Sequence, residues 1–300
     1  MKIKAKRYYL YGLLKIFYFL TSLLPIRVIS YIGVLCGRIG FYLSTKQRHI
    51  TIEHLKRSFP EKSSKEIYVI AKKVFENIVR SFAEFSQAWK ITTKNKELWF
   101  IDNGMDKVKA CLKQGKGCII LIGHLGNWEF FGQYFPLMGV KASTIVKDMY
   151  FYKYNIWLSQ LRKIKGLGLI DRREKPRQLL KLLKSNIALG ILADQDIESI
   201  EGIFVDFFKK KAYTPIAPVK LAMVTGAPIV PCFMVRVGKR YRFIAEDPIF
   251  IIDEKGKEKQ ESIRKYTEKW SAIFEQYITK YPEQWVWMHR RWKTRPAMEG

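Results

Sequence analysis

The strongest constraint on the fold is an alternation of short apolar runs and amphipathic segments that begins at Gly117. Short runs rich in β-branched residues are typical of strands, and segments with a period near 3.6 are typical of helices. Upstream, Ser63 and Glu66 form a capping box that predicts a helix to about residue 89. The expected strands are 118–122, 143–146, 167–170, 187–193, 203–207, 229–235 and 242–245, and the expected helices are 127–138, 152–164, 175–183, 216–224 and 261–280. This alternation predicts an α/β domain with a central mixed sheet flanked by helices.

The N-terminal segment differs from the rest of the chain. Its first 52 residues contain nine Lys or Arg and no Asp or Glu, and two apolar stretches, 8–24 and 26–43, are split by Pro25. A stripe of small residues in the second stretch would allow close helix packing: Ser30, Gly33, Gly37 and Gly40. We expect residues 1–43 to form an uncleaved helical membrane arm in front of a catalytic α/β domain at 44–300, inserted as an interfacial segment or hairpin. A buried helical hairpin of a soluble protein is the alternative interpretation.

The net charge points to an anionic partner. The chain has 54 Lys or Arg against 27 Asp or Glu, which gives +27 at neutral pH. Nucleic acid, acidic lipid headgroups and an acidic carrier protein would all satisfy this charge. The 14% aromatic content favours a membrane interface, where rings with one polar end are stabilised. A basic nucleic-acid-binding protein is the non-enzyme alternative, and the long apolar arm counts against it.

Several kinds of site are not expected from the motifs. The cysteines are widely spaced and form no C-x-x-C pair, and no H-E-x-x-H occurs, so neither a metal site nor a disulfide framework is expected. The chain has no G-x-S-x-G nucleophile elbow. It also lacks a phosphate-binding loop and a complete dinucleotide fingerprint. We therefore expect an activity that uses no metal and no cofactor.

The phrase Gly123-His124-Leu125-Gly126-Asn127-Trp128-Glu129 directly follows the expected strand 118–122. On a continuous helix, residues five apart point about 140° away from each other and could not meet. At a strand-to-helix turn, however, Glu129 could return to His124. The carboxylate would then bind one imidazole nitrogen, and the other nitrogen would be the general base for a substrate hydroxyl. An ordinary structural His–Glu pair is the alternative.

This phrase resembles a known family. His124-x-x-x-x-Glu129 is similar to the hallmark of the glycerolipid acyltransferase superfamily, and the full phrase resembles that of the late lipid A acyltransferases of the lauroyl and myristoyl type. The resemblance covers nearly the whole chain. The further segments that carry it are Asp194-Gln195, 202–208, 217–231 and 283–296.

The resemblance implies a glycerolipid-acyltransferase-like fold and an acyl transfer reaction. The donor would be an acyl carrier protein thioester, and the acceptor a hydroxyl or hydroxyacyl chain of a lipid A precursor, an anionic glycolipid. The reaction would take place at the cytoplasmic face of the bacterial inner membrane. His124 would be the general base and Glu129 would orient it. Bacterial mannoside acyltransferases share much of the pattern, so a phosphatidylinositol mannoside acceptor with an acyl-CoA donor is the alternative.

Six further residues are predicted to bind substrate. Three of them follow expected strands, where cationic side chains could meet phosphates or the oxyanion, although a solvated basic surface is the alternative: Lys147, Arg172 and Arg173. Asp194 and Gln195 are expected to shape the acceptor pocket, although a structural turn is the alternative, and Asn127 is also predicted to bind substrate. The predicted partners are the carrier protein, the glycolipid and the membrane surface, with no nucleic acid.

Overall fold

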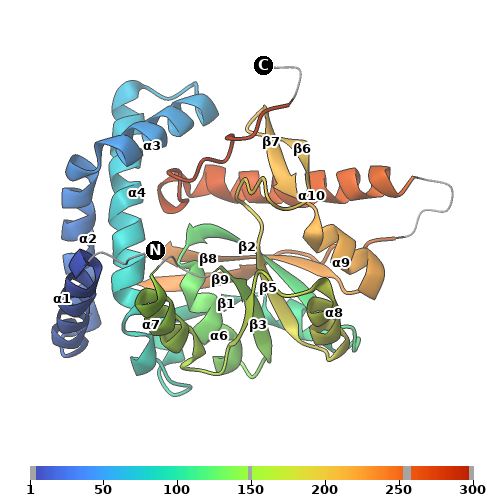
Figure 1. The fold of residues 1–300 in the computed structure, drawn as a ribbon, viewed down its shortest axis with the longest axis horizontal. Helices are drawn as coiled ribbons and strands as arrows, with labels where there is room; N and C mark the ends of the chain where they lie inside the picture. Colours follow the sequence, from blue (N-terminus) through green and yellow to red (C-terminus); the bar gives the residue numbers. More distant parts are fainter. Residues whose placement is uncertain (1–4, 148–150, 253–257, 297–300) are drawn as a thin grey trace.

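The computed structural model describes residues 5–147, 151–252 and 258–296, and is built around a seven-stranded, mostly parallel sheet (Figure 1). The strand order is β1-β9-β8-β2-β5-β3-β4, and β9 runs antiparallel to β8. The strands are β1 (Phe100–Asn103), β2 (Cys118–Gly126), β3 (Ala142–Val146), β4 (Gly168–Asp171), β5 (Ala188–Leu192), β8 (Ile229–Val237) and β9 (Arg240–Ala245). A separate antiparallel hairpin consists of β6 (Gly202–Phe207) and β7 (Lys210–Pro215). The α/β prediction is confirmed.

The described helices surround this sheet and form the N-terminal arm. They are α1 (Ala5–Ser22), α2 (Ile26–Leu43), α3 (Thr45–Ser58), α4 (Ser64–Phe85), α5 (Met105–Leu112), α6 (Phe131–Leu137), α7 (Tyr152–Lys163), α8 (Pro176–Lys184), α9 (Ala217–Thr225) and α10 (Lys259–Lys280), with short 3-10 helices at Ala88–Lys90, Lys96–Leu98, Trp128–Phe130 and Pro282–Gln284. The capping box is present: Ser63 Oγ accepts from the backbone of Glu66, whose carboxylate accepts from Ser63 N.

The sheet separates two apolar cores. Alternate residues of β2 point to opposite faces, so Ile119 and Leu121 pack in one core while Ile120 and Ile122 pack in the other. Helices α8, α9 and α10 contribute to the first core, and α5, α6 and α7 contribute to the second. Figure 1 shows α10 and α6 on opposite sides of the sheet. Both faces of the parallel strands are therefore covered, which explains why these strands read as continuous apolar runs.

The turn after β2 departs from the predicted helix at 127–138. Strand β2 continues to Gly126, which has φ +67°, and a Cβ at this position would lie 2.0 Å from the carbonyl oxygen of Met234. Only glycine fits such a close approach with a positive φ. A 3-10 turn at Trp128–Phe130 follows before α6 begins at Phe131. His124 therefore lies close to the end of β2, two residues before this turn begins at Gly126.

The arm helix α2 packs on α4 through part of its small-residue stripe. A Cβ at Gly37 would lie 2.5 Å from the carbonyl oxygen of Phe75, and one at Gly33 would lie 2.7 Å from Arg80 Cα, whereas Gly40 has no atom within 4 Å. Within the described residues, α2 is the one helix long and apolar enough to cross a membrane, with a mean hydropathy of 1.4 over 18 residues. Large apolar side chains remain exposed on α1, in the link to α2 and on the other face of α2: Leu13, Ile16, Phe19, Leu20, Leu23, Val28, Tyr31, Leu35, Ile39, Tyr42 and Leu43.

Candidate active site

His124 is held by Asp194, a residue that follows the neighbouring strand β5. The imidazole Nδ1 lies 2.7 Å from Asp194 Oδ1, and the backbone N–H of His124 donates to Asp194 Oδ2 over 2.7 Å. Trp285 Nε1 donates to the same Oδ2 over 2.8 Å. Because β2 and β5 are parallel neighbours, their carboxyl ends meet at one edge of the sheet. This shared edge brings together two residues that are seventy positions apart in the sequence.

Asp194 fixes the protonation pattern of the imidazole. The carboxylate is only 3% exposed, and burial raises its pKa; the charge and hydrogen bond of His124 outweigh burial and hold this pKa well below its usual range. An ionised carboxylate only accepts hydrogen bonds, so Nδ1 carries a proton and donates it. In the neutral tautomer that this contact favours, Nε2 is the nitrogen without a proton and can accept one from a substrate.

Glu129 does not orient His124, which corrects the expectation from the sequence. Its two oxygens accept from Arg162 of α7, from Nε over 2.7 Å and from Nη2 over 2.5 Å. The Glu129 carboxylate is nearly buried, and this bidentate ion pair with Arg162 fixes its position. The physical reason is the 3-10 turn after Asn127, which directs Glu129 toward α7 instead of back to the strand end. His124 obtains from Asp194 the hydrogen bond that the sequence analysis assigned to Glu129.

Gln195 and His289 cover the free nitrogen of His124. Gln195 Nε2 lies 3.2 Å from His124 Nε2 and 2.5 Å from His289 Nδ1, so one amide can donate to both rings. The two ring centroids are 4.7 Å apart. Burial lowers the pKa of His289 to about 4, helped by the neighbouring His124 and opposed by Asp194. His289 is therefore neutral at pH 7 and adds no second charge beside the base.

A large apolar cavity opens at His124. Its volume is about 1080 Å³, at or beyond the upper end of the roughly 300–1,000 Å³ typical of small-molecule sites. The last paired residues of β3 and β5 are Thr144 and Gly190. Beyond them the strands separate, and the four residues that follow line the cavity: Ile145, Val146, Ile191 and Leu192. Residues of both apolar cores contribute to its walls, so the cavity extends from one face of the sheet to the other.

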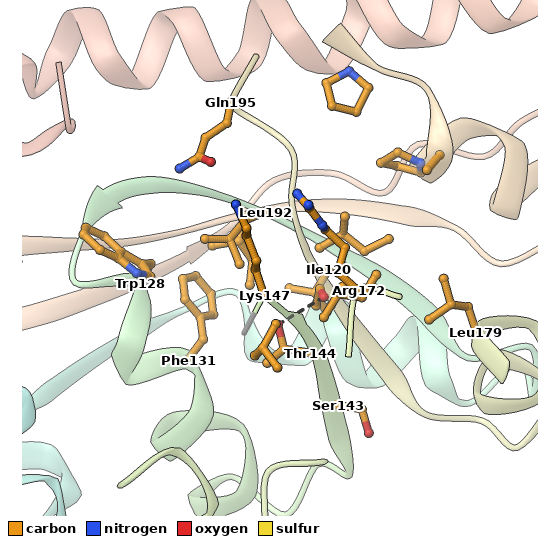
Figure 2. A pocket seen from close by; sticks show the side chains of 18 of the residues that line it. Ile120, Trp128, Phe131, Ser143, Thr144, Lys147, Arg172, Leu179, Leu192 and Gln195 are labelled. Atoms are coloured by element: carbon orange, nitrogen blue, oxygen red, sulfur yellow. Dashed lines mark hydrogen bonds between the residues drawn. The ribbon is translucent and has the colours of Figure 1, made fainter. Parts of the chain in front are cut away.

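Two predicted cations line this cavity and a third lies outside it. Lys147, directly after β3, and Arg172, directly after β4, both extend into the cavity toward Gln195 (Figure 2). Trp128 and Phe131 lie on one side of them and Leu179 on the opposite side. Arg173 points to solvent, with its side chain 76% exposed, and its guanidinium pairs with the carboxylate of Asp171 over 2.6 Å. Only the first two cations are placed to meet a ligand inside the cavity.

Asn127 supports the turn from behind. Its Nδ2 donates to the Ser81 carbonyl over 3.0 Å and to the Tyr241 hydroxyl over 3.3 Å. The Tyr241 hydroxyl in turn donates to Glu84, a buried carboxylate of α4. Asn127 is 1% exposed, and its amide is occupied by these scaffold contacts. Asn127 therefore does not line the cavity, whereas Gln195, another predicted substrate-binding residue, does.

Glu84 links this support to the arm. Arg236 of β8 binds the Glu84 carboxylate with Nη2 over 2.6 Å and Nη1 over 3.1 Å, and Arg80 adds a contact of 3.0 Å. Ser30 of α2 also donates to Glu84. Burial alone would raise the pKa of Glu84, but the two arginines and Ser30 outweigh burial. The net effect is a lowered pKa, so the carboxylate is ionised. One buried charge therefore joins α2, α4 and the sheet beneath the His124 turn.

Sequence reasoning missed three residues of the site. Arg162 is one basic residue among many on an ordinary helix, and no pattern pointed to it. Trp285 and His289 lie in the C-terminal phrase on which the family resemblance partly rests, but nothing in that phrase indicated contact with Asp194 or His124. Among the described residues, no group of three or more His, Cys, Asp or Glu is arranged to hold a metal ion.

A histidine held by a buried carboxylate at a large apolar cavity is an arrangement suited to acyl transfer onto a substrate hydroxyl. Fold and site together define an acyltransferase. The chain belongs to the bacterial lipid A biosynthesis acyltransferase family, whose sequence profile matches residues 1–294.

Named relatives agree with this family. The lipid A biosynthesis palmitoleoyltransferase of Escherichia coli K12 is 25% identical over 282 residues, which cover 92% of this chain and 89% of the relative. The lauroyltransferase of the same organism is 26% identical over 283 residues, covering 91% and 88%. A phosphatidylinositol mannoside acyltransferase of Mycobacterium tuberculosis is 24% identical over 193 residues, covering 63% and 58%. The printed names of these relatives therefore cover two acceptor classes, lipid A and a phosphatidylinositol mannoside.

Proposed function

We propose that this enzyme transfers a fatty acyl chain from an acyl carrier protein thioester to a hydroxyl of a lipid A precursor. The observation that carries the proposal is the His124–Asp194 pair, whose imidazole lines a cavity large enough for acyl chains. The similarity to two lipid A acyltransferases over about nine-tenths of their length supports the acceptor class. The net charge of +27 suits both an acidic carrier and an anionic glycolipid.

The proposed reaction needs one base and no covalent enzyme intermediate. His124 Nε2 takes the proton of the acceptor hydroxyl as its oxygen attacks the thioester carbonyl carbon. The new ester C–O bond forms, the C–S bond breaks, and the leaving thiolate takes the proton back from the imidazolium. Asp194 stabilises the imidazolium and keeps the ring in position, and this kind of base catalysis is worth roughly 10²–10⁴-fold.

Other cavity residues would handle charge and chain. Lys147 and Arg172 are proposed to bind phosphate groups or the developing oxyanion, because both extend toward the end of the cavity that holds Gln195. The acyl chain being transferred is proposed to occupy the part of the cavity between the sheet and α6, where Phe131 and Phe135 are nearly buried. This enclosed part would limit the length of chain accepted.

The enzyme is proposed to work at the cytoplasmic face of the inner membrane. The exposed apolar side chains of α1 and α2 form a surface that a membrane interface would cover, and their segment carries no acid before Glu53. Basic residues flank this surface and suit anionic headgroups.

The test is a donor and acceptor panel with purified protein in mixed micelles. Carrier-linked and CoA-linked acyl donors of several lengths are each offered with a lipid A precursor and a phosphatidylinositol mannoside, and products are read by mass spectrometry. Transfer to the lipid A precursor from the carrier-linked donor is the expected result. Transfer to the mannoside alone would contradict the proposed acceptor.

A further inference from the structure

We propose that the outer face of α8 is the docking surface for the acidic carrier protein, and that the cavity beneath α8 and α9 admits its thioester arm. The inference rests on the proposed function, because it presumes a carrier-linked donor. The carrier would thus bind one specific surface of this chain and would not depend only on the positive charge spread over the whole molecule.

The first observation is the division of α8 into two faces. Pro176, Leu179, Leu180 and Leu183 recur at helical spacing, and the last of these is fully buried against the sheet. A neighbouring face is basic and exposed, with cations at helical spacing: Arg177, Lys181 and Lys184. Lys175, at the N-cap, is a fourth exposed cation at the start of the helix. The helix contains no acid, and in the described structure none of these four cations makes an ion pair.

Unpaired cations concentrated on one helix are an expected counterpart for an acidic protein surface. A cation already paired with a carboxylate, as Arg173 is with Asp171, offers less net field to a partner. Charges at an exposed rim act mainly by steering the encounter and fixing its register. The positive charges of α8 are therefore complementary to an acidic protein surface, and no neighbouring carboxylate neutralises them.

The second observation is that the inner face of the same helix lines the His124 cavity. Pro176, Leu179 and Leu180 contribute to its wall, opposite Val224 of α9. Val224 is 65% exposed, so the cavity reaches the surface between the two helices. A flexible arm entering here would pass Arg172 and Lys147 on its way to His124. The docking face and the entry path are thus two sides of one short helix.

The third observation is position. Figure 1 shows α8 and α9 at the end of the sheet opposite to α1 and α2. A carrier on α8 would leave the apolar surface of α1 and α2 free to bind a membrane. A water-soluble donor and a lipid acceptor could then be bound at the same time without competing for one surface.

The test compares two charge-reversed forms of the full chain. In the first, Arg177→Glu is combined with Lys181→Glu on α8. The matched control combines Lys269→Glu with Lys280→Glu, two exposed cations of α10, and changes the net charge equally. Each is assayed with the same acyl group on the carrier protein and on free pantetheine, so that the donors differ only in the protein part.

We expect the α8 variant to lose about tenfold or more in kcat/KM with the carrier-linked donor and to stay within about twofold with the pantetheine thioester. The loss should shrink as salt rises, because screening removes the same attraction in the wild type. The α10 control should stay within about twofold for both donors. Equal losses in the two variants would assign steering to the diffuse field and overturn the proposal.

Loss with both donors would also overturn it, since α8 would then only form the cavity wall. Thermal unfolding of each variant, with the milder pair Arg177→Gln and Lys181→Gln, separates misfolding from lost docking. If the wild type is inactive with every donor, it is the proposed function that fails. If the wild type transfers chains from the carrier but the α8 variant does so equally well, only the docking surface is wrong.

Discussion

His124 depends on Asp194 for both its position and its tautomer, and the substitution Asp194→Asn separates these roles from simple loss of the base. An asparagine keeps the shape but lacks the charge that stabilises the imidazolium, and its amide can donate to Nδ1 and favour the wrong tautomer. We expect kcat to fall by roughly 10³–10⁴-fold, measured on a folded protein with saturating substrates. A variant with near wild-type kcat would show that the base is oriented by another group.

Glu129 and Arg162 form a nearly buried pair, so removing one charge leaves the other without a partner. We expect Glu129→Gln to lower the free energy of unfolding by about 3 kcal/mol, measured by denaturant titration. The double variant with Arg162→Gln removes both charges and should recover most of this loss. A double variant as unstable as the single would contradict the pairing.

The same double variant tests the catalytic role that the family resemblance assigned to Glu129. Because the hydrogen bond between His124 and Asp194 is unchanged, we expect the kcat of the double variant to stay within about tenfold of the wild type. A folded but inactive double variant would show that the Glu129–Arg162 pair takes part in acyl transfer.

His289 makes stability depend on pH in a defined direction. Its pKa is about 4 in the folded chain and near the ordinary value of 6.5 when unfolded. Between these values the unfolded chain binds more protons, so this contribution to stability is present above pH 6.5 and is lost as pH falls toward 4. We expect His289→Gln to flatten the fall in melting temperature over this window. An unchanged slope would place His289 in solvent.

The residues of the site were predictable to different degrees. His124 and Glu129 were found because they lie close together in one phrase at the end of an apolar run. The sequence could not rank Glu129 against Asp194 as the partner of His124, since Asp194 reaches the imidazole only through the pairing of β2 with β5. Local spacing reports on turns, whereas contacts between strands depend on sheet order.

At the scale of elements, the packing of α2 on α4 is sensitive to side-chain size at Gly37. A Cβ at Gly37 would meet the backbone of α4, which cannot move aside as a side chain would. We expect Gly37→Ala to destabilise the protein by about 1–3 kcal/mol in detergent, measured by thermal unfolding. Gly40→Ala, with open space around it, is the matched control and should be neutral or stabilising by up to about 1 kcal/mol. Equal effects would show that α2 is not packed on α4.

The expected elements lie within a few residues of the observed ones, and the exceptions have identifiable causes. Strand β1 is short and follows a polar segment, and β7 begins with three consecutive polar or small residues, so neither shows a strong apolar pattern. The expected strand at 203–207 is present but pairs only with β7, because periodicity does not say which sheet a strand joins. The helix at 127–138 starts late for the reason found at Gly126.

At the scale of the whole molecule, the apolar surface of α1 and α2 is predicted to set membrane binding. Leu35 and Ile39 are exposed on α2, away from α4. Replacing both with serine removes apolar area that a bilayer would bury, and should weaken binding to anionic vesicles by about tenfold or more in a flotation assay. The control replaces Phe250 and Ile252, which as a pair are at least as exposed as Leu35 and Ile39 but lie outside the arm. Similar losses in both would argue against a specific membrane surface.

The division into an arm at 1–43 and a catalytic domain at 44–300 is a prediction that composition alone suggested. Charge and hydropathy change near residue 43, but they do not report contacts. In the folded chain Ser30 and Arg38 of the arm bind Glu84 and Glu76 of α4. Deleting the arm would therefore remove a partner of the buried Glu84 as well as the apolar surface, so loss of activity after truncation would not by itself identify an anchor.

The cavity that passes from one face of the sheet to the other has a consequence for kinetic order. Exposed lining residues occur at Phe82 of α4, near the arm, and at Val224 of α9, at the far end. Two substrates that enter from different ends need not wait for each other to leave, and a site without a nucleophile stores no acyl group between them. With the proposed donor and acceptor, we therefore expect a ternary complex, seen as intersecting initial-velocity lines, in which a spent carrier can be exchanged for a loaded one while the lipid is still bound.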